Sequence, residues 1–214
     1  MINSTLSVRT SDMILCRGGF NIHPELSEYP GHCRGRTAGV PCRGGFNIHP
    51  RREVVLSAKI QIIAVGKIKE KYYTDAAAEY KKRLSRFCKL TITEVEDERN
   101  PKEPNEALTQ RVLEKESLKI QPYLKNSVVI AMDIKGSKVS SERFSEIVRG
   151  YFENERDITF VVGGSLGLAA DILESADLRL SMSDMTFPHQ LARIMLIEQI
   201  YRAFKIIVNE TYHK

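Results

Sequence analysis

Short apolar segments alternate with amphipathic helical segments along the chain from Lys59 onwards. The apolar segments read KIQIIAVGK, LTITEV, SVVIAMDI, ITFVVGG and LRLSMS. Apolar residues at helical spacing occupy residues 73–87, 105–120, 141–152 and 168–174, and a long helix is predicted near the carboxyl end. This alternation is typical of an α/β structure, in which helices flank a mostly parallel sheet on both faces.

Residues 1–58 have a different character, because they lack any such periodicity. The sequence CRGGFNIHP occurs at residues 16–24 and again, without change, at residues 42–50. Two copies are too few for a repeat architecture, which needs about three units to bury a shared core. We therefore expect residues 1–58 to be a disordered N-terminal extension, which a misplaced start codon would explain. Residues 59–214 are expected to form the folded domain.

A metal site is the alternative interpretation of the extension. Its candidate ligands would be Cys16, His23, Cys33, Cys42 and His49. The spacing of Cys16 and His23 matches neither the short Cys-Cys knuckle nor the His-His arm of common zinc modules. The sequence therefore favours a protein that binds no metal.

The charge of the chain is modest once the extension is set aside. The formal net charge is +5, but residues 1–58 hold seven Lys or Arg and four Asp or Glu, which leaves +2 for the remainder. Any surface that contacts phosphates must then be a local patch of Lys and Arg. The chain also has no apolar run of membrane-spanning length and no apolar signal segment, which predicts a cytoplasmic protein without a membrane partner.

Three loops follow predicted strands and carry unusual residues. They are MDIKG at 132–136, GGSLG at 163–167 and MSDMTF at 182–187. In parallel sheets the ligand site lies beyond the carboxyl ends of the strands, where such loops meet. Neither the dinucleotide pattern G-x-G-x-x-G nor the phosphate loop G-x-x-x-x-G-K is present, so the nucleotide sites that these motifs build are not expected.

The third loop and the helix after it raise two further questions. Met182, Met185 and Phe187 are too apolar for a solvated loop, so they either pack inward or line a pocket for an aromatic ligand such as adenine. Pro188 suits a helix start, with Thr186 or a neighbour as the cap. Apolar residues then cover more than one face of the helix, which predicts a second copy of the chain as a packing partner.

Four segments together resemble a known family. AVGKIKEKYY, VVGGSLGL, MSDMTFPHQLARIMLIEQIYRAFKI and the terminal YHK are similar to the ribosomal large-subunit pseudouridine methyltransferase H family, SPOUT-class enzymes with a C-terminal trefoil knot. The resemblance covers residues 59–214 and none of 1–58. It implies a homodimer that uses S-adenosylmethionine to methylate N3 of a pseudouridine in large-subunit (23S-type) ribosomal RNA. The alternatives are a SPOUT enzyme with another target nucleotide and a non-catalytic RNA-binding or ribosome-binding module.

The resemblance also implies where the cofactor binds. The residues that match the family's cofactor pocket come from the three loops identified above. They are Met132, Gly163, Met182, Ser183, Asp184, Met185, Thr186 and Phe187.

Candidates for catalysis and RNA contact lie in the last helix and at the carboxyl end. His189 is a candidate base for the N3 proton, or a helix-start residue that bonds carbonyls or water. Arg193 is a candidate to stabilise the imide anion or bind phosphate, or else to pair with a carboxylate. Tyr212, His213 and Lys214 are expected to reach the RNA from the neighbouring subunit, unless they form an untethered tail.

Further basic residues complete the expected RNA surface. Arg202 and Lys205 would act with Arg193, and a second cluster contains Lys67, Lys69 and Lys71. Because the domain carries a net charge of only +2, we expect weak binding to naked RNA and recognition of an assembled large subunit or 70S ribosome.

Overall fold

The computed structural model describes residues 59–99 and 105–212, so the extension predicted at 1–58 and the terminal His213 and Lys214 lie outside the described residues. The strands are β1 (Lys59–Val65), β2 (Lys89–Val95), β3 (Val128–Lys138), β4 (Ile158–Val162) and β5 (Leu178–Ser181). The helices are α2 (Lys71–Leu84), α3 (Glu106–Ile120), the short 3-10 helix η1 (Gln121–Tyr123), α4 (Ser141–Glu153), α5 (Ala170–Ser175) and α6 (His189–Ile207). Every strand and helix predicted from periodicity is present.

The described strands form one parallel sheet. Their order is β2-β1-β4-β3-β5, and each neighbouring pair runs in the same direction. The predicted α/β architecture is thereby confirmed, and all carboxyl ends of the strands lie at one edge of the sheet. The trefoil knot implied by the family resemblance stays a prediction.

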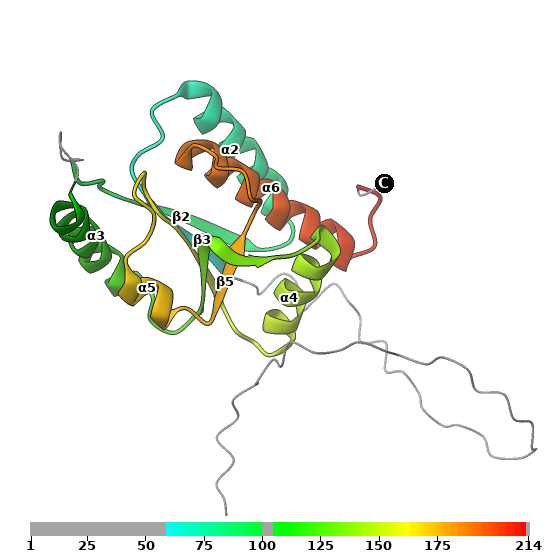
Figure 1. Ribbon diagram of the computed structural model, residues 1–214. Coiled ribbons are helices and arrows are strands. Elements are labelled where there is room, and N and C mark those ends of the chain that lie inside the picture. Colours follow the sequence, from blue (N-terminus) through cyan, green and yellow to red (C-terminus); the bar gives the residue numbers. More distant parts are fainter. Residues whose placement is uncertain (1–58, 100–104, 213–214) are drawn as a thin grey trace, which may run out of the picture. The chain divides into compact units, whose positions relative to one another are not determined.

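Helices cover both faces of the sheet, as Figure 1 shows. Alternate residues of a strand point to opposite faces, and β1 is apolar on both. Ile60 and Ile62 belong to the larger core cluster, which includes α2, α4 and α6. Ile63 and Val65 belong to a second cluster with α3 and α5. This double burial explains why the strand reads as a continuous apolar run.

The carboxyl half of α6 is anchored by aromatic packing. Phe204 is fully buried and its ring stacks on Phe87 at 5.6 Å and on Phe152 at 5.7 Å between ring centroids. Burial of one such ring contributes roughly 1.5–3 kcal/mol. The long helix is therefore fixed against α4 and the segment after α2, which also fixes the direction of its amino end.

Two details differ from the sequence-based expectation. Strand β3 continues to Lys138, beyond the predicted end at residue 134, with a register shift against β5 between Met132 and Ser137. Gly136 permits this close crossing, since a Cβ there would lie 2.7 Å from the backbone carbon of Leu180. At the start of α6, Pro188 is the N-cap residue rather than part of the first turn, and it makes no side-chain cap bond.

Within residues 59–99 and 105–212, no helix combines the length and the apolar character needed to cross a membrane.

Candidate cofactor pocket and active site

A cavity of about 550 Å³ opens at the carboxyl edge of the sheet, beyond the ends of β3, β4 and β5. All three loops singled out in the sequence contribute to its wall. Seven of the eight residues expected to contact a cofactor line it, namely Met132, Gly163, Met182, Ser183, Met185, Thr186 and Phe187. Its size lies in the usual range for small-molecule sites, roughly 300–1,000 Å³.

Asp184 is the exception among the expected cofactor contacts. Its side chain is 82% exposed and forms an ion pair with Lys138 at the end of β3. The carboxylate therefore links two of the loops on the outside of the cavity and does not line it.

The glycines of the second loop are required by its geometry. A Cβ on Gly163 would lie 2.3 Å from the carbonyl oxygen of Gly167, a separation that no side chain tolerates. Gly164 and Gly167 form an antiparallel bridge, and Gly167 has a φ of 87°, which favours glycine. The loop is thus both a tight strand-to-helix turn and a wall of the cavity.

All three apolar residues of the third loop line the cavity, but they differ in how far they also pack against the core. Met182 packs against the larger core cluster, whereas Met185 is 68% exposed. The Ser183 hydroxyl accepts a hydrogen bond from the backbone N–H of Met185 at 3.0 Å, which shapes the turn. Met182 therefore both packs inward and lines the cavity, and Met185 leaves an exposed apolar side chain at the cavity wall.

His189 is the first residue of α6 and lines the cavity. It faces the turn after β1, because a Cβ on Gly66 would lie 3.6 Å from His189 Nε2 and 3.7 Å from the Cγ of Asp97. Burial lowers the pKa of His189, the charges of Arg193 and Lys69 lower it further, and Asp97 opposes them. The imidazole is therefore neutral at pH 7 and able to accept a proton.

Asp97 was not identified from the sequence. It lies in the segment after β2, and only the fold brings it beside the turn at Gly66. An acidic residue in a charged segment, DERN, gives no signal of that position.

Arg193 was expected to stabilise the imide anion, to bind phosphate or to pair with a carboxylate. Its side chain is fully buried. Its guanidinium donates to Glu94 Oε1 at 2.6 Å, to the Gly66 carbonyl at 2.8 Å and to the Val65 carbonyl at 3.3 Å. Burial lowers the pKa of Arg193 and Glu94 opposes that shift. Of the roles expected for Arg193, the geometry supports pairing with a carboxylate, which is that of Glu94.

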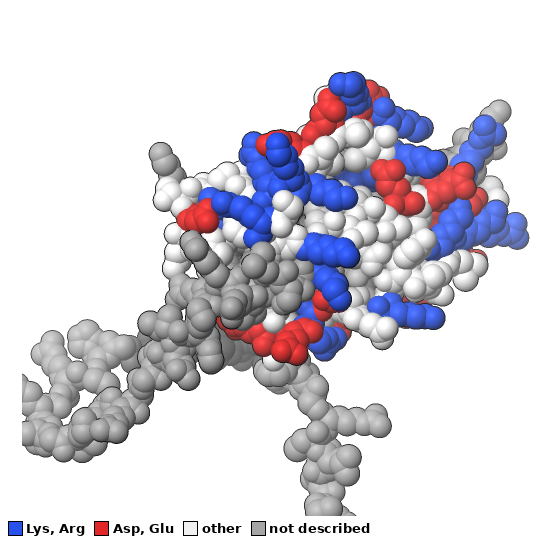
Figure 2. Space-filling model, turned by 180° about the vertical axis from the view of Figure 1, so that it is seen from behind, with Lys and Arg blue, Asp and Glu red and all other residues white. Residues whose placement is uncertain are grey.

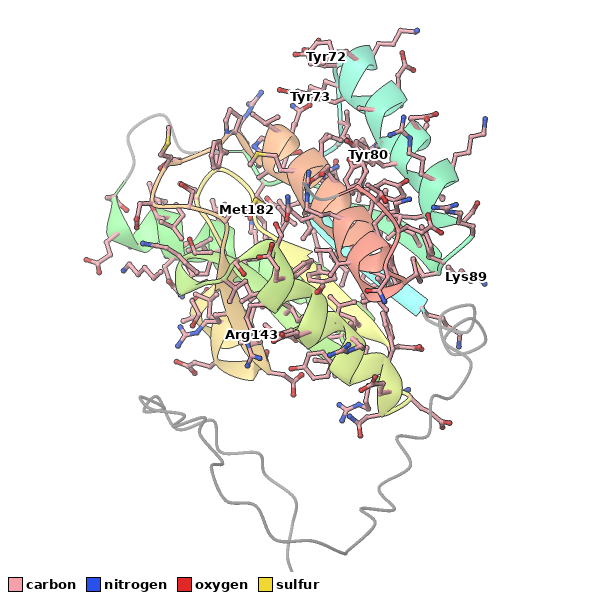
Figure 3. The ribbon with its side chains drawn as sticks, turned by 90° about the vertical axis from the view of Figure 1, so that its right-hand side faces the viewer. Tyr72, Tyr73, Tyr80, Lys89, Arg143 and Met182 are labelled. Carbon is pink, nitrogen blue, oxygen red and sulfur yellow. The ribbon has the colours of Figure 1, made fainter. Side chains whose placement is uncertain are left out.

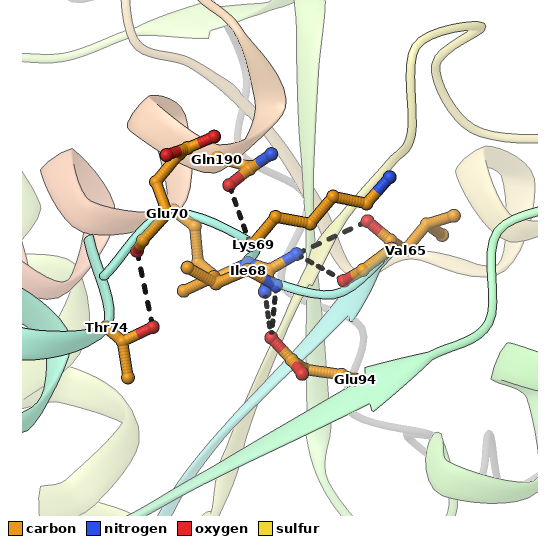
Figure 4. A network of polar contacts seen from close by, with 9 residues as sticks. Val65, Ile68, Lys69, Glu70, Thr74, Glu94 and Gln190 are labelled. Atoms are coloured by element: carbon orange, nitrogen blue, oxygen red, sulfur yellow. Dashed lines mark hydrogen bonds and ion pairs between the residues drawn. The ribbon is translucent and has the colours of Figure 1, made fainter. Parts of the chain in front are cut away.

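These bonds form a clamp on the loop between β1 and α2 (Figure 4). We use the term Arg193 clamp for Arg193, Glu94 and Gln190. Glu94 Oε1 also accepts from the backbone N–H of Ile68 at 3.0 Å, and Gln190 Oε1 accepts from that of Lys69 at 3.2 Å. Strand β2 and the first turns of α6 thus hold the loop that begins at Gly66 beside the cavity residue His189.

A family model described as "Predicted SPOUT methyltransferase" matches residues 58–213. The chain belongs to the SPOUT methyltransferase family. It is 51% identical over 158 residues to "Ribosomal RNA large subunit methyltransferase H 1" of Clostridium perfringens, covering 72% of this chain and 99% of that protein. It is 49% identical over 158 residues to "Ribosomal RNA large subunit methyltransferase H" of Acetivibrio thermocellus, covering 73% and 99% respectively. The family predicted from the four sequence segments is confirmed.

The carboxyl end of this SPOUT methyltransferase is folded onto α6 as far as Tyr212. The Tyr212 ring meets Tyr201 edge-on at 5.0 Å, lies under the Arg202 guanidinium at 4.9 Å, and its hydroxyl donates to Glu198 at 3.3 Å. Burial, assisted by Tyr80 and Glu198, raises the pKa of Tyr212 to about 12. Tyr212 is therefore tethered to α6 within the chain, and the untethered-tail alternative does not apply to it.

Two other basic residues expected at the RNA surface have acidic partners in this SPOUT methyltransferase. Arg202 pairs with Glu198 at 2.7 Å, and Lys205 pairs with Glu210.

Within residues 59–99 and 105–212, no group of three or more His, Cys, Asp or Glu side chains is arranged to hold a metal ion.

Proposed function

We propose that this chain is an S-adenosylmethionine-dependent methyltransferase that modifies N3 of a pseudouridine in large-subunit ribosomal RNA. One observation carries the proposal. The cavity formed by the three strand-end loops has His189 in its wall, in a chain about half identical to proteins named ribosomal RNA large subunit methyltransferase H.

The cavity suits an adenosyl group with a methionine tail. S-adenosylmethionine supplies a methyl group that its sulfonium has already activated. Met182, Met185 and Phe187 offer apolar surface to an adenine ring, and the wall at Gly163 brings backbone close to the ligand because no side chain intervenes. Ser183 and Thr186 supply hydroxyls in the same wall. Asp184 takes part by fixing the loop through Lys138.

His189 is the proposed general base. The N3–H of pseudouridine is a weak acid, and its anion is the better nucleophile toward the methyl group. Because the pKa of His189 is lowered, the imidazole is in the neutral form that accepts this proton at pH 7. Asp97, whose carboxylate lies near the same point beside Gly66 as the imidazole, favours the imidazolium that results.

Arg193 acts through other residues rather than on RNA. Its guanidinium is buried and occupied by Glu94 and two backbone carbonyls. It positions the β1–α2 loop and the first turns of α6, and therefore the imidazole of His189. We accordingly assign to Arg193 a positioning role in place of a direct contact with phosphate or imide.

The outer surface of α6 supports the proposal of a homodimer. Leu191, Met195 and Ile206 are half-buried apolar residues at intervals that place them along one stripe of the helix. A second copy of the chain, packed on this stripe by a two-fold axis, would cover it and bring one carboxyl end toward the other subunit's cavity. Tyr212, followed by His213 and Lys214, is then placed to contact the RNA bound there.

The proposed partner is an assembled ribosomal particle in the cytoplasm. Figure 2 shows Lys and Arg side chains spread among Asp and Glu on one face rather than gathered into a single field. Such a surface gives little sequence-independent attraction to naked RNA. Shape and local contacts on the large subunit or the 70S ribosome would supply the remaining affinity.

The test combines cofactor titration with methyl transfer to large subunits that lack the modification. Saturable binding of S-adenosylmethionine and transfer to N3 of one pseudouridine support the proposal. Transfer to another nucleotide or atom would indicate a SPOUT enzyme with a different target. Absence of cofactor binding in the full chain would indicate a non-catalytic RNA-binding module.

A further inference from the structure

A second surface lies beside the cavity, on the loop that the Arg193 clamp holds. Residues 67–73 read KIKEKYY, and we call them the 67–73 surface. Lys67, Lys69 and Lys71 are exposed. Tyr72 is 62% exposed, more than any other aromatic residue in the described part of the chain. Large exposed aromatic rings beside lysines are typical of surfaces that bind nucleic acid.

The lysines of this surface differ in how they are engaged. Lys71 pairs with Asp75 at 3.1 Å. No ion pair within the described part of the chain involves Lys67 or Lys69, and no dashed line in Figure 4 reaches the ammonium group of Lys69. Two ammonium groups are thus available to phosphates, whereas Arg202 and Lys205 have acidic partners.

The aromatic rings also differ in whether other side chains of the chain contact them. The Tyr212 ring already contacts Tyr201 and Arg202. Tyr72 contacts only the neighbouring Tyr73 among described rings, with centroids 4.4 Å apart. Figure 3 shows Tyr72 and Tyr73 at one end of α2 and Lys89, which begins β2, at the opposite end of the fold. The exposed ring therefore belongs to the same edge as the cavity.

The 67–73 surface is rigidly connected to the proposed site. The backbone N–H groups of Ile68 and Lys69 are held by Glu94 and Gln190, and Gln190 directly follows His189. The charge of Lys69 is close enough to affect the imidazole of His189. The loop that carries this surface begins at Gly66, where a Cβ would lie 3.6 Å from Nε2 of the cavity residue His189.

We propose that the 67–73 surface binds the single-stranded RNA next to the target nucleotide. A flanking base stacks on Tyr72, while Lys67 and Lys69 contact the phosphates. A base that enters an enzyme pocket must leave its stack, which frees its neighbours to stack on protein rings. This inference rests on the proposed function, and it adds a substrate contact that the cofactor pocket and the carboxyl end do not provide.

The experiment measures binding of the full chain to unmodified large subunits at several KCl concentrations and constant Mg²⁺. Tyr72→Ala should raise the Kd roughly ten-fold without changing the salt dependence, since stacking is uncharged. Tyr72→Phe keeps the ring and should bind like the wild-type chain. The double variant Lys67→Ala with Lys69→Ala should reduce the slope of log K against log salt by about 1.4, or about 0.7 for each phosphate contact on a single strand.

Matched controls separate this surface from general effects of substitution. Tyr123→Ala removes another exposed ring, 43% exposed, from η1. Lys81→Ala with Lys82→Ala removes two exposed lysines from the far end of α2. Both controls should keep the wild-type Kd and salt slope, and all variants should keep the wild-type affinity for S-adenosylmethionine.

Two results would overturn the inference. One is a Kd and a salt slope in the 67–73 variants that match those of the controls. The other is a change in the oligomeric state of Tyr72→Ala, measured by sedimentation, that accounts for its loss of RNA binding. The surface would then join two copies of the chain. A wild-type chain that neither binds the cofactor nor transfers methyl groups would instead refute the proposed function.

Discussion

The guanidinium of Arg193 on α6 lies 2.6 Å from the carboxylate of Glu94 on β2, with no exposure of the Arg193 side chain to solvent. The same guanidinium holds the carbonyls of Val65 and Gly66 at the end of β1. One buried cation therefore joins an outer strand, an inner strand and the helix that begins at the cavity. This arrangement links the stability of the fold to the geometry of the proposed site.

Arg193→Met should destabilise the fold strongly. The substitution leaves Glu94 and two carbonyls without their donor, and removal of one partner from a buried ion pair costs about 3 kcal/mol or more of unfolding free energy. Urea unfolding measures the loss. Arg143→Met, which breaks the exposed pair with Glu146 on α4, should cost less than about 1 kcal/mol. Equal losses for the two variants would contradict a structural role for the clamp.

Gly163→Ala should abolish cofactor binding, because its Cβ would lie 2.3 Å from the Gly167 carbonyl oxygen and force the loop open. Gly150→Ala is the control, since a Cβ there meets nothing within 4 Å. In the middle of α4, that change should stabilise the fold by about 0.5–1 kcal/mol. Calorimetric titration with S-adenosylmethionine checks both, and an unchanged affinity in Gly163→Ala would show that the loop is not the binding wall.

The rate of methyl transfer should fall at acidic pH with the protonation of His189. Its pKa is lowered from the usual value of 6.5, so kcat/KM should be level near pH 7 and decline only below 6.5. His189→Gln should be slow and should lack this acidic decline, with a rate that rises in alkali as N3 ionises unaided. A wild-type acidic decline that persists in His189→Gln would exclude this base.

The lowered pKa of His189 also makes the unfolding free energy depend on pH. Between the lowered pKa of folded His189 and 6.5, the unfolded chain binds the proton and the folded chain does not. The unfolding free energy therefore falls as the pH drops below 6.5 and levels off once the folded imidazole is protonated. His189→Gln should remove this component from a series of urea titrations at different pH values.

The proposed homodimer depends on the outer stripe of α6, which contains Leu191, Met195 and Ile206. Met195→Lys places a charge in that stripe and should give monomers in analytical ultracentrifugation at micromolar concentration. Leu118→Lys changes an apolar residue of α3 that is 66% exposed and should leave the dimer intact. A wild-type chain that is monomeric at high concentration would contradict the predicted assembly.

Much of the fold is readable from the sequence because the strands are buried on both faces and the helices are amphipathic. Periodicity places the strands and helices to within a few residues, and the parallel sheet follows from their alternation. The strand order β2-β1-β4-β3-β5 does not follow from it, because periodicity carries no information on which strands are neighbours.

The candidate site likewise contains some residues that the sequence identifies and others that only the fold brings together. Gly163, the methionine loop and His189 could be named as candidates because they lie in segments that follow predicted strands and resemble the family's motifs, which are local signals. The sequence left the role of Arg193 open between an RNA contact and a carboxylate partner, because Glu94 lies 99 residues away in sequence. Asp97 and the buried Glu116, whose carboxylate accepts from the Glu98 N–H at 3.0 Å, also depend on contacts between distant segments. A side chain that is charged and buried cannot be told from a solvated one without its partner.

The most direct test incubates the full chain with methyl-labelled S-adenosylmethionine and large ribosomal subunits or 70S ribosomes that lack the modification, and then maps the labelled base. We predict one methyl group per particle, on N3 of a single pseudouridine, with loss of labelling in Gly163→Ala. Cofactor that binds without any transfer to ribosomal RNA, or a label on another class of molecule, would contradict the account.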